Sequence, residues 1–379
     1  MAEIEIGIGK SGRRGYSIDE VTIVPSRRTR DADEVDVSWQ IDAYQFAVPV
    51  IGAATDGVTS PATAIEMGRL GAAAALHLEG LWCRHEDPAT LLADLAAIDD
   101  ELVAVQRLRE LHASPVVPTL IAERVQEIRD GGATVCVAIR PSRTEELLAH
   151  VVKAEPDLLL IQGTVTSAEH VTDGAHTPLD LKHLVRRLEV PVLVGGCASY
   201  QAALHLMRTG AAGVLVGVGH GGTSTTGRVL GVGNPQATAI ADARAARMRH
   251  LDETGVYVHV IADGGLATGG DIAKAIVCGA DGVVLGTPLA RAVEAPAGGA
   301  VWSMSTFHDG LPRSRFRRVS EAGTLEQILV GPAERADGRT NLIGALRKSM
   351  AVTGYGSLKD LQKADLMVSS APTVRPGAQ

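Results

Sequence analysis

The chain has 379 residues, 45% of them hydrophobic, with 42 glycines but only three Trp, five Tyr and three Phe, which favours an α/β core of parallel strands covered by helices. The net charge of −8 and the lack of a basic stripe exclude a nucleic-acid-binding surface. The four cysteines form no CxxC pair, so we expect neither a zinc site nor a disulfide framework. The sequence shows neither a secretory leader nor an apolar run of about 18 residues, so we expect no membrane span. Together these features favour a reducing, cytoplasmic location.

The first 47 residues are mixed and polar, and we expect them to form an N-terminal arm. A basic run, Pro25–Arg30, lies within this arm. A solvated segment is the favoured interpretation of the run, because a duplex requires a broad basic surface.

From residue 48 onward, short β-type runs alternate with helical patterns. The eight predicted strands are 48–54, 72–78, 134–139, 157–163, 190–196, 212–219, 257–265 and 281–287. The predicted helices include Pro61–Leu70, Ala89–His112, Thr119–Asp130, Ser142–Ala154, Tyr200–Thr209, Gln236–Leu251, Gly270–Cys278 and Pro288–Glu294. This alternation is typical of βαβ units, and eight units favour a closed (β/α)8 TIM barrel that spans the chain as a single domain.

Five of the predicted strands end in glycine, at Gly163, Gly196, Gly219, Gly264 and Gly286. In a (β/α)8 barrel the carboxyl ends of the strands form the reactive face, where glycine leaves room for a ligand. Glycine is also a common turn residue in its own right. We favour the ligand interpretation, because five strands share the feature.

Residues 295–340 lack clear periodicity and are rich in Gly, Pro, Ser and Arg. Such a segment is typical of an active-site cover or a disordered insert, and we name it the flap segment. Residues 341–366 are predicted to form closing helices, at Leu342–Val352 and Ser357–Ala364. The last residues, Ser369–Gln379, are expected to form a frayed tail.

One glycine-rich stretch, Gly213–Gln236, reads GVLVGVGHGGTSTTGRVLGVGNPQ. It begins as an apolar strand, opens into a loop of Gly, Ser and Thr, and ends at Asn234-Pro235, where a helix can start. The loop offers backbone N–H groups and hydroxyls without bulk, which suits an anionic or monovalent ligand. It contains no cysteine and no acid, and its only imidazole is that of His220.

Five segments together resemble the IMP dehydrogenase/GMP reductase family. They are YSIDEVTIVPSR, VPVIGAATDGVTSP with Asp56, GVGHGGTSTTGRVLGVGNPQATAIADA, VIADGGLATGGDIAKAIVCGADGVVLGTPLA and NLIGALRKSMAVTGYGSLKDL. The resemblance extends from Tyr16 to Leu366 and does not include the regulatory CBS pair that many dehydrogenases insert after the second strand. The chain is most similar to short, CBS-less actinobacterial paralogues related to IMP dehydrogenase.

The resemblance implies that the ligand is a purine nucleoside 5′-monophosphate, namely IMP, GMP or XMP. The substrate-binding residues that it implies are Gly222, Asp263, Gly264, Gly265, Gly286 and Thr287. Asp263 would accept hydrogen bonds from the ribose hydroxyls, and the backbone N–H groups of Gly265, Gly286 and Thr287 would hold the phosphate. Apart from the resemblance, loops after strands 7 and 8 of such barrels commonly bind phosphate. The alternative is a simple Asp-Gly-Gly turn, which the strand context disfavours.

The nucleophile of the family is a loop cysteine that attacks C2 of the purine, and Ser224 stands at that position here. A thiol has a pKa of about 8.5 and ionises readily, whereas a serine hydroxyl needs a base. His220 could pair with Ser224, but an ordinary loop hydroxyl is the favoured interpretation because no acid accompanies the pair. Thr226 and Glu294 match the two residues that handle protons in the reductase.

The resemblance also implies a nicotinamide cofactor, NAD(H) or NADP(H), and a potassium ion. The cofactor positions are Gln162 and Gly163, and the candidate K⁺ ligands are backbone carbonyls at Gly219, Gly221 and Ser224.

Several positions depart from the family pattern. Gln162 replaces an aspartate, Cys197 an asparagine and Gly222 a serine. The flap Arg-Tyr pair of the dehydrogenase has no counterpart, although the same region contains Arg313, Arg315, Arg317 and Arg318. Cys197 could in principle supply the missing thiol, but most free cysteines are buried hydrophobes.

Three hypotheses of function follow from this pattern. The first is a nucleotide-binding oxidoreductase of guanine nucleotide metabolism whose catalysis is weakened or lost. The second is an active enzyme, more GMP reductase than IMP dehydrogenase because Thr226 and Glu294 remain. The third is a non-catalytic regulatory partner of a true IMP dehydrogenase. The resemblance implies a homotetramer or octamer, and the third hypothesis implies mixed assembly with the IMP dehydrogenase paralogue. We expect the chain to bind neither nucleic acid nor membrane.

Overall fold

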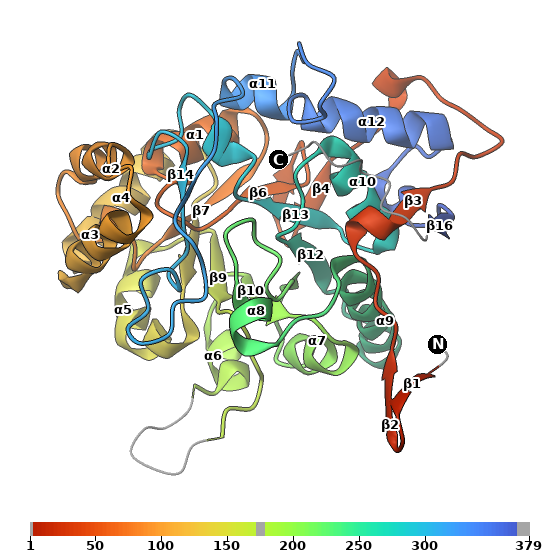
Figure 1. Ribbon diagram of the computed structural model, residues 1–379, viewed down its shortest axis with the longest axis horizontal. Coiled ribbons are helices and arrows are strands. Elements are labelled where there is room, and N and C mark those ends of the chain that lie inside the picture. The colour runs from red at the N-terminus through yellow and green to blue at the C-terminus, as the bar shows by residue number, and fades with distance from the viewer. Residues whose placement is uncertain (1–2, 172–178, 370–379) are drawn as a thin grey trace.

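A closed barrel of eight parallel strands forms the centre of the molecule (Figure 1). The computed structural model describes residues 3–171 and 179–369, so most of the predicted tail lies outside the described residues. The barrel strands are β6 Val50–Gly52, β7 Ala73–His77, β8 Cys136–Ile139, β9 Leu158–Gln162, β10 Val192–Cys197, β11 Gly213–Val216, β12 His259–Asp263 and β13 Gly282–Leu285. Neighbours in the chain are neighbours in the sheet, and β13 pairs with β6 to close it. Each strand coincides with a predicted one, and the (β/α)8 TIM barrel is confirmed.

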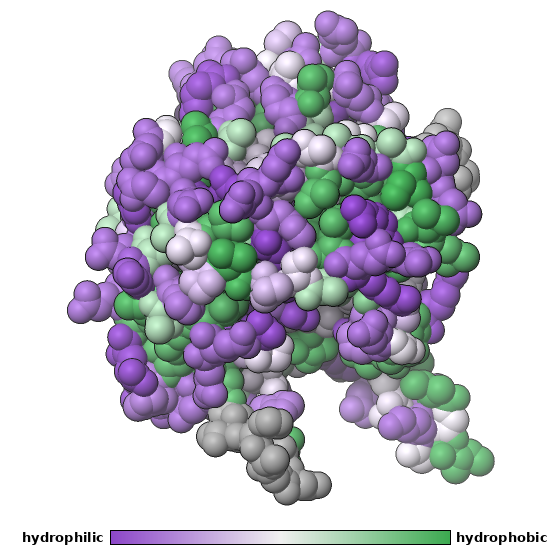
Figure 2. All heavy atoms as spheres, turned by 90° about the vertical axis from the view of Figure 1, so that its left-hand side faces the viewer, coloured by the Kyte–Doolittle hydropathy of each residue, from purple (hydrophilic) through white to green (hydrophobic). Residues whose placement is uncertain are grey.

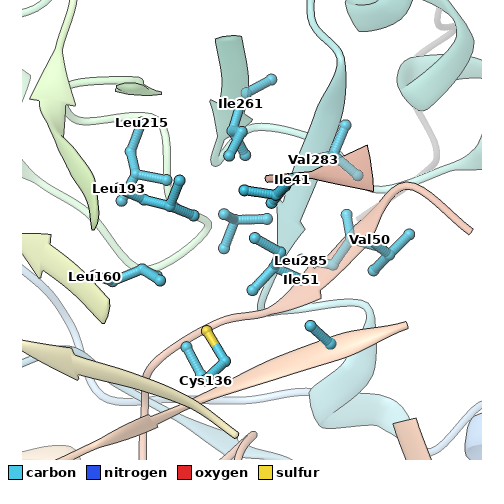
Figure 3. Close-up of a cluster of buried hydrophobic side chains, with 14 of the residues drawn as sticks. Ile41, Val50, Ile51, Cys136, Leu160, Leu193, Leu215, Ile261, Val283 and Leu285 are labelled. Carbon is cyan, nitrogen blue, oxygen red and sulfur yellow. The ribbon is translucent and has the colours of Figure 1, made fainter. Parts of the chain in front are cut away.

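Branched aliphatic side chains fill the barrel (Figure 3). Ile51, Leu193, Leu215 and Ile261 are fully buried and lie in one cluster. These strands are covered on one face by the barrel interior and on the other by helices, which explains their nearly continuous apolar sequences. A packed interior leaves chemistry to the loops at the ends of the strands.

Helices surround the barrel and also extend beyond it. Those between barrel strands include α1 Pro61–Arg69, α4 Pro118–Asp130, α5 Thr144–Ala154, α6 Leu181–Arg187, α7 Tyr200–Met207, α9 Gln236–Thr254 and α10 Gly269–Cys278. The same connections also contain α2 Pro88–Ala96, α3 Glu101–Ala113 and α8 Thr226–Leu230, whereas α11 Leu325–Leu329, α12 Leu342–Thr353 and α13 Leu358–Leu361 follow the last barrel strand. Nothing in the described part of the chain forms a helix with the length and apolar character that crossing a membrane requires.

Two helix predictions are wrong. The single helix predicted over 89–112 is split into α2 and α3. The Asp100 carboxylate accepts hydrogen bonds from the backbone N–H groups of Leu102 and Val103, and this cap starts a new helix. The helix predicted at Pro288–Glu294 is only a 3-10 turn. The prediction did not include α6, α8 and α11, which have seven, five and five residues.

The first 47 residues form three separate pieces of β-structure. β1 Glu3–Gly7 and β2 Lys10–Arg13 form a hairpin that projects at the bottom of Figure 1. β3 Val21–Ile23 pairs with β16 Leu366–Val368 near the other end of the chain. The third piece closes the amino end of the barrel.

This closing piece is the hairpin of β4 Trp39–Ile41 and β5 Tyr44–Phe46. A Cβ added to Gly282, the first residue of β13, would lie 2.5 Å from the Trp39 ring, so the ring packs directly on the strand backbone. Ile41 is fully buried within the cluster of barrel side chains (Figure 3). The amino end of the barrel is therefore plugged, and the predicted site residues lie at the opposite, carboxyl end of the strands.

The flap segment is anchored to α2 and α3. Trp302 and Phe316 stack with ring centroids 5.7 Å apart and belong to a second hydrophobic core that includes Leu92 and Leu108 of the two helices. The segment also contains β14 Ala300–Val301, β15 Arg317–Arg318 and α11. Of the two interpretations of this segment, the disordered insert does not fit its packed core.

Candidate functional site

The six predicted substrate-binding residues come together at the carboxyl ends of β12 and β13. Asp263 is the last residue of β12 and pairs with Val284 of β13. Gly264 and Gly265 follow Asp263 with φ angles of 87° and 78°, a conformation that favours glycine. Gly286 and Thr287 follow β13 directly. A carboxylate thus lies beside two turns with little side-chain bulk.

The glycine-rich loop packs directly on these two turns. A Cβ on Gly264 would lie 2.7 Å from the backbone nitrogen of Gly221, and a Cβ on Gly222 would lie 2.6 Å from Thr287 Oγ1. Side chains at Gly222 and Gly264 would therefore collide with the opposite segment. The replacement of the family's serine by Gly222 fits this close approach.

The Asp263 carboxylate is held by a residue predicted for a different role. Gln162, at the end of β9, donates a hydrogen bond of 2.7 Å from Nε2 to Asp263 Oδ2. Burial raises the pKa of Asp263 to about 6, and the bond from Gln162 opposes that rise. Below the strand ends, the buried Gln236 side chain donates from Nε2 to the carbonyls of Val216, at 2.8 Å, and Asp263, at 3.4 Å.

Ser224 lies next to Thr226 rather than next to His220. Its Oγ donates to Thr226 Oγ1 at 3.1 Å, and its backbone N–H donates to the carbonyl of Gly221 at 2.8 Å. His220 Nε2 contacts the carbonyl of Asn234, and burial lowers the pKa of the ring. The Ser–His pair is therefore not formed, in agreement with the favoured interpretation.

The structure places Thr226 and Glu294 in different contacts. Thr226 is buried and lies beside Ser224. The Glu294 carboxylate is exposed and accepts a hydrogen bond of 2.9 Å from the backbone N–H of Leu325, the first residue of α11. Glu294 therefore stabilises the start of a flap helix, which is a different partner from the one its predicted role requires.

The strand ends at the predicted cofactor position are tightly bonded to each other. The backbone N–H of Gly163 donates to the carbonyl of Gly195 at 2.8 Å, and that of Gly196 donates to the carbonyl of Gly163 at 2.9 Å. Cys197 is 2% exposed, and burial raises the pKa of its thiol to about 12. Cys197 is thus a buried hydrophobe, as expected, and not a substitute nucleophile.

The candidate K⁺ ligands lie on the glycine-rich loop. Gly219 has a φ angle of 83°, and the carbonyl of Gly221 already accepts the N–H of Ser224. No cluster of three or more His, Cys, Asp or Glu residues suited to a metal ion occurs in residues 3–171 and 179–369. Backbone carbonyls are the donors that remain for a monovalent ion.

The sequence did not predict that the flap segment pairs with this loop. Ser314 and Ser224 form an antiparallel bridge, with hydrogen bonds from the Thr225 N–H to the Arg313 carbonyl at 2.8 Å and from the Arg315 N–H to the Thr223 carbonyl at 2.9 Å. The Arg317 guanidinium donates to the carbonyl of Gly222 at 2.7 Å. The alternation Arg313-Ser314-Arg315-Phe316-Arg317 is the period-two signal that could have indicated an extended strip here.

A second group of buried ionisable residues borders the mouth. Asp56, which follows β6, accepts a hydrogen bond of 2.9 Å from the backbone N–H of Leu81 and lies 3.4 Å from His112 Nε2. Phe307 of the flap segment packs against the His112 ring at an interplanar angle of 31°, with centroids 4.1 Å apart. Asp56, which the motif contained, thus helps to connect the barrel to α3 and to the flap segment.

Comparison with known proteins agrees with this arrangement. The family description "IMP dehydrogenase / GMP reductase domain" matches residues 15–308. An uncharacterized oxidoreductase of Mycolicibacterium smegmatis is 49% identical over 375 residues, covering 97% of this chain and all of that protein. The inosine-5′-monophosphate dehydrogenase of Methanocaldococcus jannaschii is 24% identical, covering 95% of this chain and 94% of that one.

A solved structure shares the whole fold. The IMP dehydrogenase/GMP reductase-like protein of Corynebacterium glutamicum superposes with a TM-score of 0.92 at 45% identity, covering 97% of this chain and 98% of that chain. The family match spans the barrel, the glycine-rich loop and the turns after β12 and β13. The chain therefore belongs to the IMP dehydrogenase/GMP reductase family.

Proposed function

We propose that this barrel binds a purine nucleoside 5′-monophosphate at the turns after β12 and β13, with NAD(P)-dependent redox catalysis that is weakened or lost. The observation that carries the proposal is the Asp263 carboxylate beside the Gly264-Gly265 and Gly286-Thr287 turns. A carboxylate suits the two ribose hydroxyls, and closely spaced backbone N–H groups suit a phosphate.

The weakened catalysis follows from Ser224. Its hydroxyl bonds Thr226, and the nearby imidazole of His220 contacts the Asn234 carbonyl, so no base is in place to ionise the serine. Removing the nucleophile of an enzyme can cost on the order of 10⁶ in rate, about 8 kcal/mol of barrier. The family reaction would be nearly silent at this loss.

The proposal also includes a nicotinamide cofactor and a potassium ion. A nicotinamide would supply or accept a hydride next to Gln162 and Gly163, but the Gln162 amide already donates to Asp263. A potassium ion would use the carbonyls of Gly219, Gly221 and Ser224. Both groups rest on family resemblance and on the donor types present.

Calorimetry tests the nucleotide site. Wild-type protein titrated with IMP, GMP and XMP should release or absorb heat with at least one of them, and Asp263→Ala should abolish the response. Parallel incubation with NAD⁺ or NADPH, followed by nicotinamide absorbance, measures the remaining redox rate. No heat at millimolar nucleotide would refute the site, and turnover that survives Ser224→Ala would refute the assigned role of Ser224.

The proposal includes self-assembly into a homotetramer or octamer. Its support is the hairpin β1–β2, where Ile4, Ile6 and Ile8 are 50%, 74% and 104% exposed. The hairpin projects away from the barrel in Figure 1, and hydrophobic surface is visible on the projection at the lower right of Figure 2. Isolated two-stranded hairpins are marginally stable in water, so a second copy that covers these isoleucines would stabilise the hairpin.

A further inference from the structure

One hydrogen bond crosses the mouth of the barrel and joins two residues predicted for different subsites. Gln162 ends β9 and Asp263 ends β12, and the sheet order places β10 and β11 between those strands. The distance from Gln162 Nε2 to Asp263 Oδ2 is only 2.7 Å. A side-chain hydrogen bond across two intervening strands requires that those strands carry no large side chains at their carboxyl ends.

The intervening strands meet that requirement with glycine. A Cβ on Gly217, after β11, would lie 1.9 Å from the Asp263 carbonyl oxygen, and a Cβ on Gly196 of β10 would lie 2.5 Å from the Gly217 carbonyl oxygen. Neither position could hold a side chain without moving the backbone. The Asp263 carbonyl also accepts a hydrogen bond from Gln236, so both the backbone and the side chain of Asp263 are fixed.

An amide at position 162 suits this contact chemically. The Nε2 group of glutamine donates to a carboxylate, whereas the family's aspartate would set a second negative charge near Asp263. Among the described residues, the side chain that hydrogen-bonds the Asp263 carboxylate is that of Gln162, which donates to Oδ2. Oδ1 is left for a ligand hydroxyl.

We infer that Gln162 is a positioning residue, which holds the Asp263 carboxylate by one oxygen so that the other accepts the ribose hydroxyls of the nucleotide. The inference rests on the proposed nucleotide site and names a residue through which that site acts. The bond to Asp263 uses one of the two N–H donors of the Gln162 amide, so this role is separate from any contact that the second N–H makes with a cofactor.

The pH dependence of binding gives a readout that a merely structural role would not change. Burial raises the pKa of Asp263 and the Gln162 hydrogen bond lowers it, so the ionised form should persist to lower pH when Gln162 is present. The loop packed over this turn carries the imidazole of His220, whose ring contacts the Asn234 carbonyl, and the guanidinium of Arg228, and the Arg317 guanidinium of the flap segment donates to the Gly222 carbonyl; both arginines stay charged over this pH range. The phosphate of the nucleotide also titrates near pH 6. All of these groups are common to all variants, so the comparison between variants isolates Asp263.

The experiment is calorimetric titration with GMP and with IMP from pH 5 to 8.5. Gln162→Ala should bind roughly tenfold more weakly than wild type at pH 7.5, and its binding should fall off about one pH unit higher. Gln162→Glu should bind more weakly still at pH 8, because two carboxylates then face each other. Gln201→Ala, which removes an exposed amide on α7, should match wild type. Binding by both Gln162 variants within twofold of wild type, with the same pH midpoint, would overturn the inference.

A second measurement separates this inference from the nucleotide site itself. In ligand-free protein with ¹³C-labelled aspartate, assigned with Asp263→Asn, the pKa of Asp263 should rise in Gln162→Ala. If wild type binds neither nucleotide, the proposed function fails. In that case an unchanged Asp263 titration overturns the role of Gln162 as well, and a raised pKa supports its control of the carboxylate.

Discussion

Asp263 lies in an environment that disfavours its own charge. Its pKa of about 6 exceeds the value of roughly 3.9 for an unfolded aspartate, so the folded state binds the proton more tightly. The resulting stabilisation is complete below about pH 4 and is lost as the pH rises through 6. A residue that costs stability at neutral pH, at the carboxyl end of a barrel strand, fits a binding role better than a structural one.

Asp263→Asn should therefore stabilise the protein at neutral pH. We expect the free energy of unfolding in urea to rise by roughly 1–2 kcal/mol at pH 7.5, a value reduced because Asp263 is partly exposed to solvent. The difference between the variant and wild type should shrink toward pH 4.5. Asp309→Asn, at an exposed flap position, is the control and should change nothing. A loss of stability in Asp263→Asn at pH 7.5 would contradict the account of this carboxylate.

Ser224 offers a test that does not depend on turnover. All four native cysteines are buried, so wild type should react slowly with a thiol reagent such as DTNB. Ser224→Cys, at a partly exposed position of the loop, should add one fast-reacting thiol, and GMP should slow its reaction severalfold. Ser320→Cys, an exposed flap position, should react equally fast without protection by GMP. Equal protection of both variants, or of neither, would refute a nucleotide site at the turns on which the Ser224 loop packs.

At the scale of elements, the pairing of the flap segment with the glycine-rich loop should govern how often that loop opens. Arg317→Ala removes the bond to the Gly222 carbonyl, and we expect amide exchange of Thr225 to accelerate severalfold. Arg315→Ala is the matched control, because the bond from residue 315 to Thr223 comes from its backbone. Equal exchange in both variants would show that the Arg317 side chain does not hold the loop.

The strands, helices and flap segment differ in how well the sequence predicted them. The barrel strands were predictable because their apolar runs and glycine ends are local features. The prediction merged α2 and α3 into one helix because a cap at Asp100 is a weak signal inside a helical pattern. The flap segment was harder, because its order comes from distant contacts such as those of Trp302 and Phe316 with Leu92 and Leu108. Periodicity reports on local structure and carries little information about such packing.

At the scale of the whole molecule, barrel closure decides which predicted residues meet. Closure brings Gln162 to Asp263, although the two are 101 residues apart, and brings Gly222 to Thr287. It also leaves the Glu294 carboxylate bonded to the start of α11. The residue types and the strand ends were predictable from the sequence, but distances across the mouth depend on strand stagger and on the flap segment, which local patterns do not encode.

The projecting hairpin makes a prediction about assembly. Replacing Ile4, Ile6 and Ile8 together with serine removes exposed apolar surface but keeps the anchor at the base of the hairpin, where Arg13 pairs with Asp242 at 2.6 Å. If a second copy covers these isoleucines, the variant should shift from tetramer or octamer toward smaller species in sedimentation velocity at micromolar protein. Its circular dichroism and GMP binding per chain should remain those of wild type, because the barrel is untouched. A triple serine at the exposed apolar positions Leu102, Val103 and Val256 is the control; if it dissociates the assembly as much as the hairpin variant does, the interface lies elsewhere.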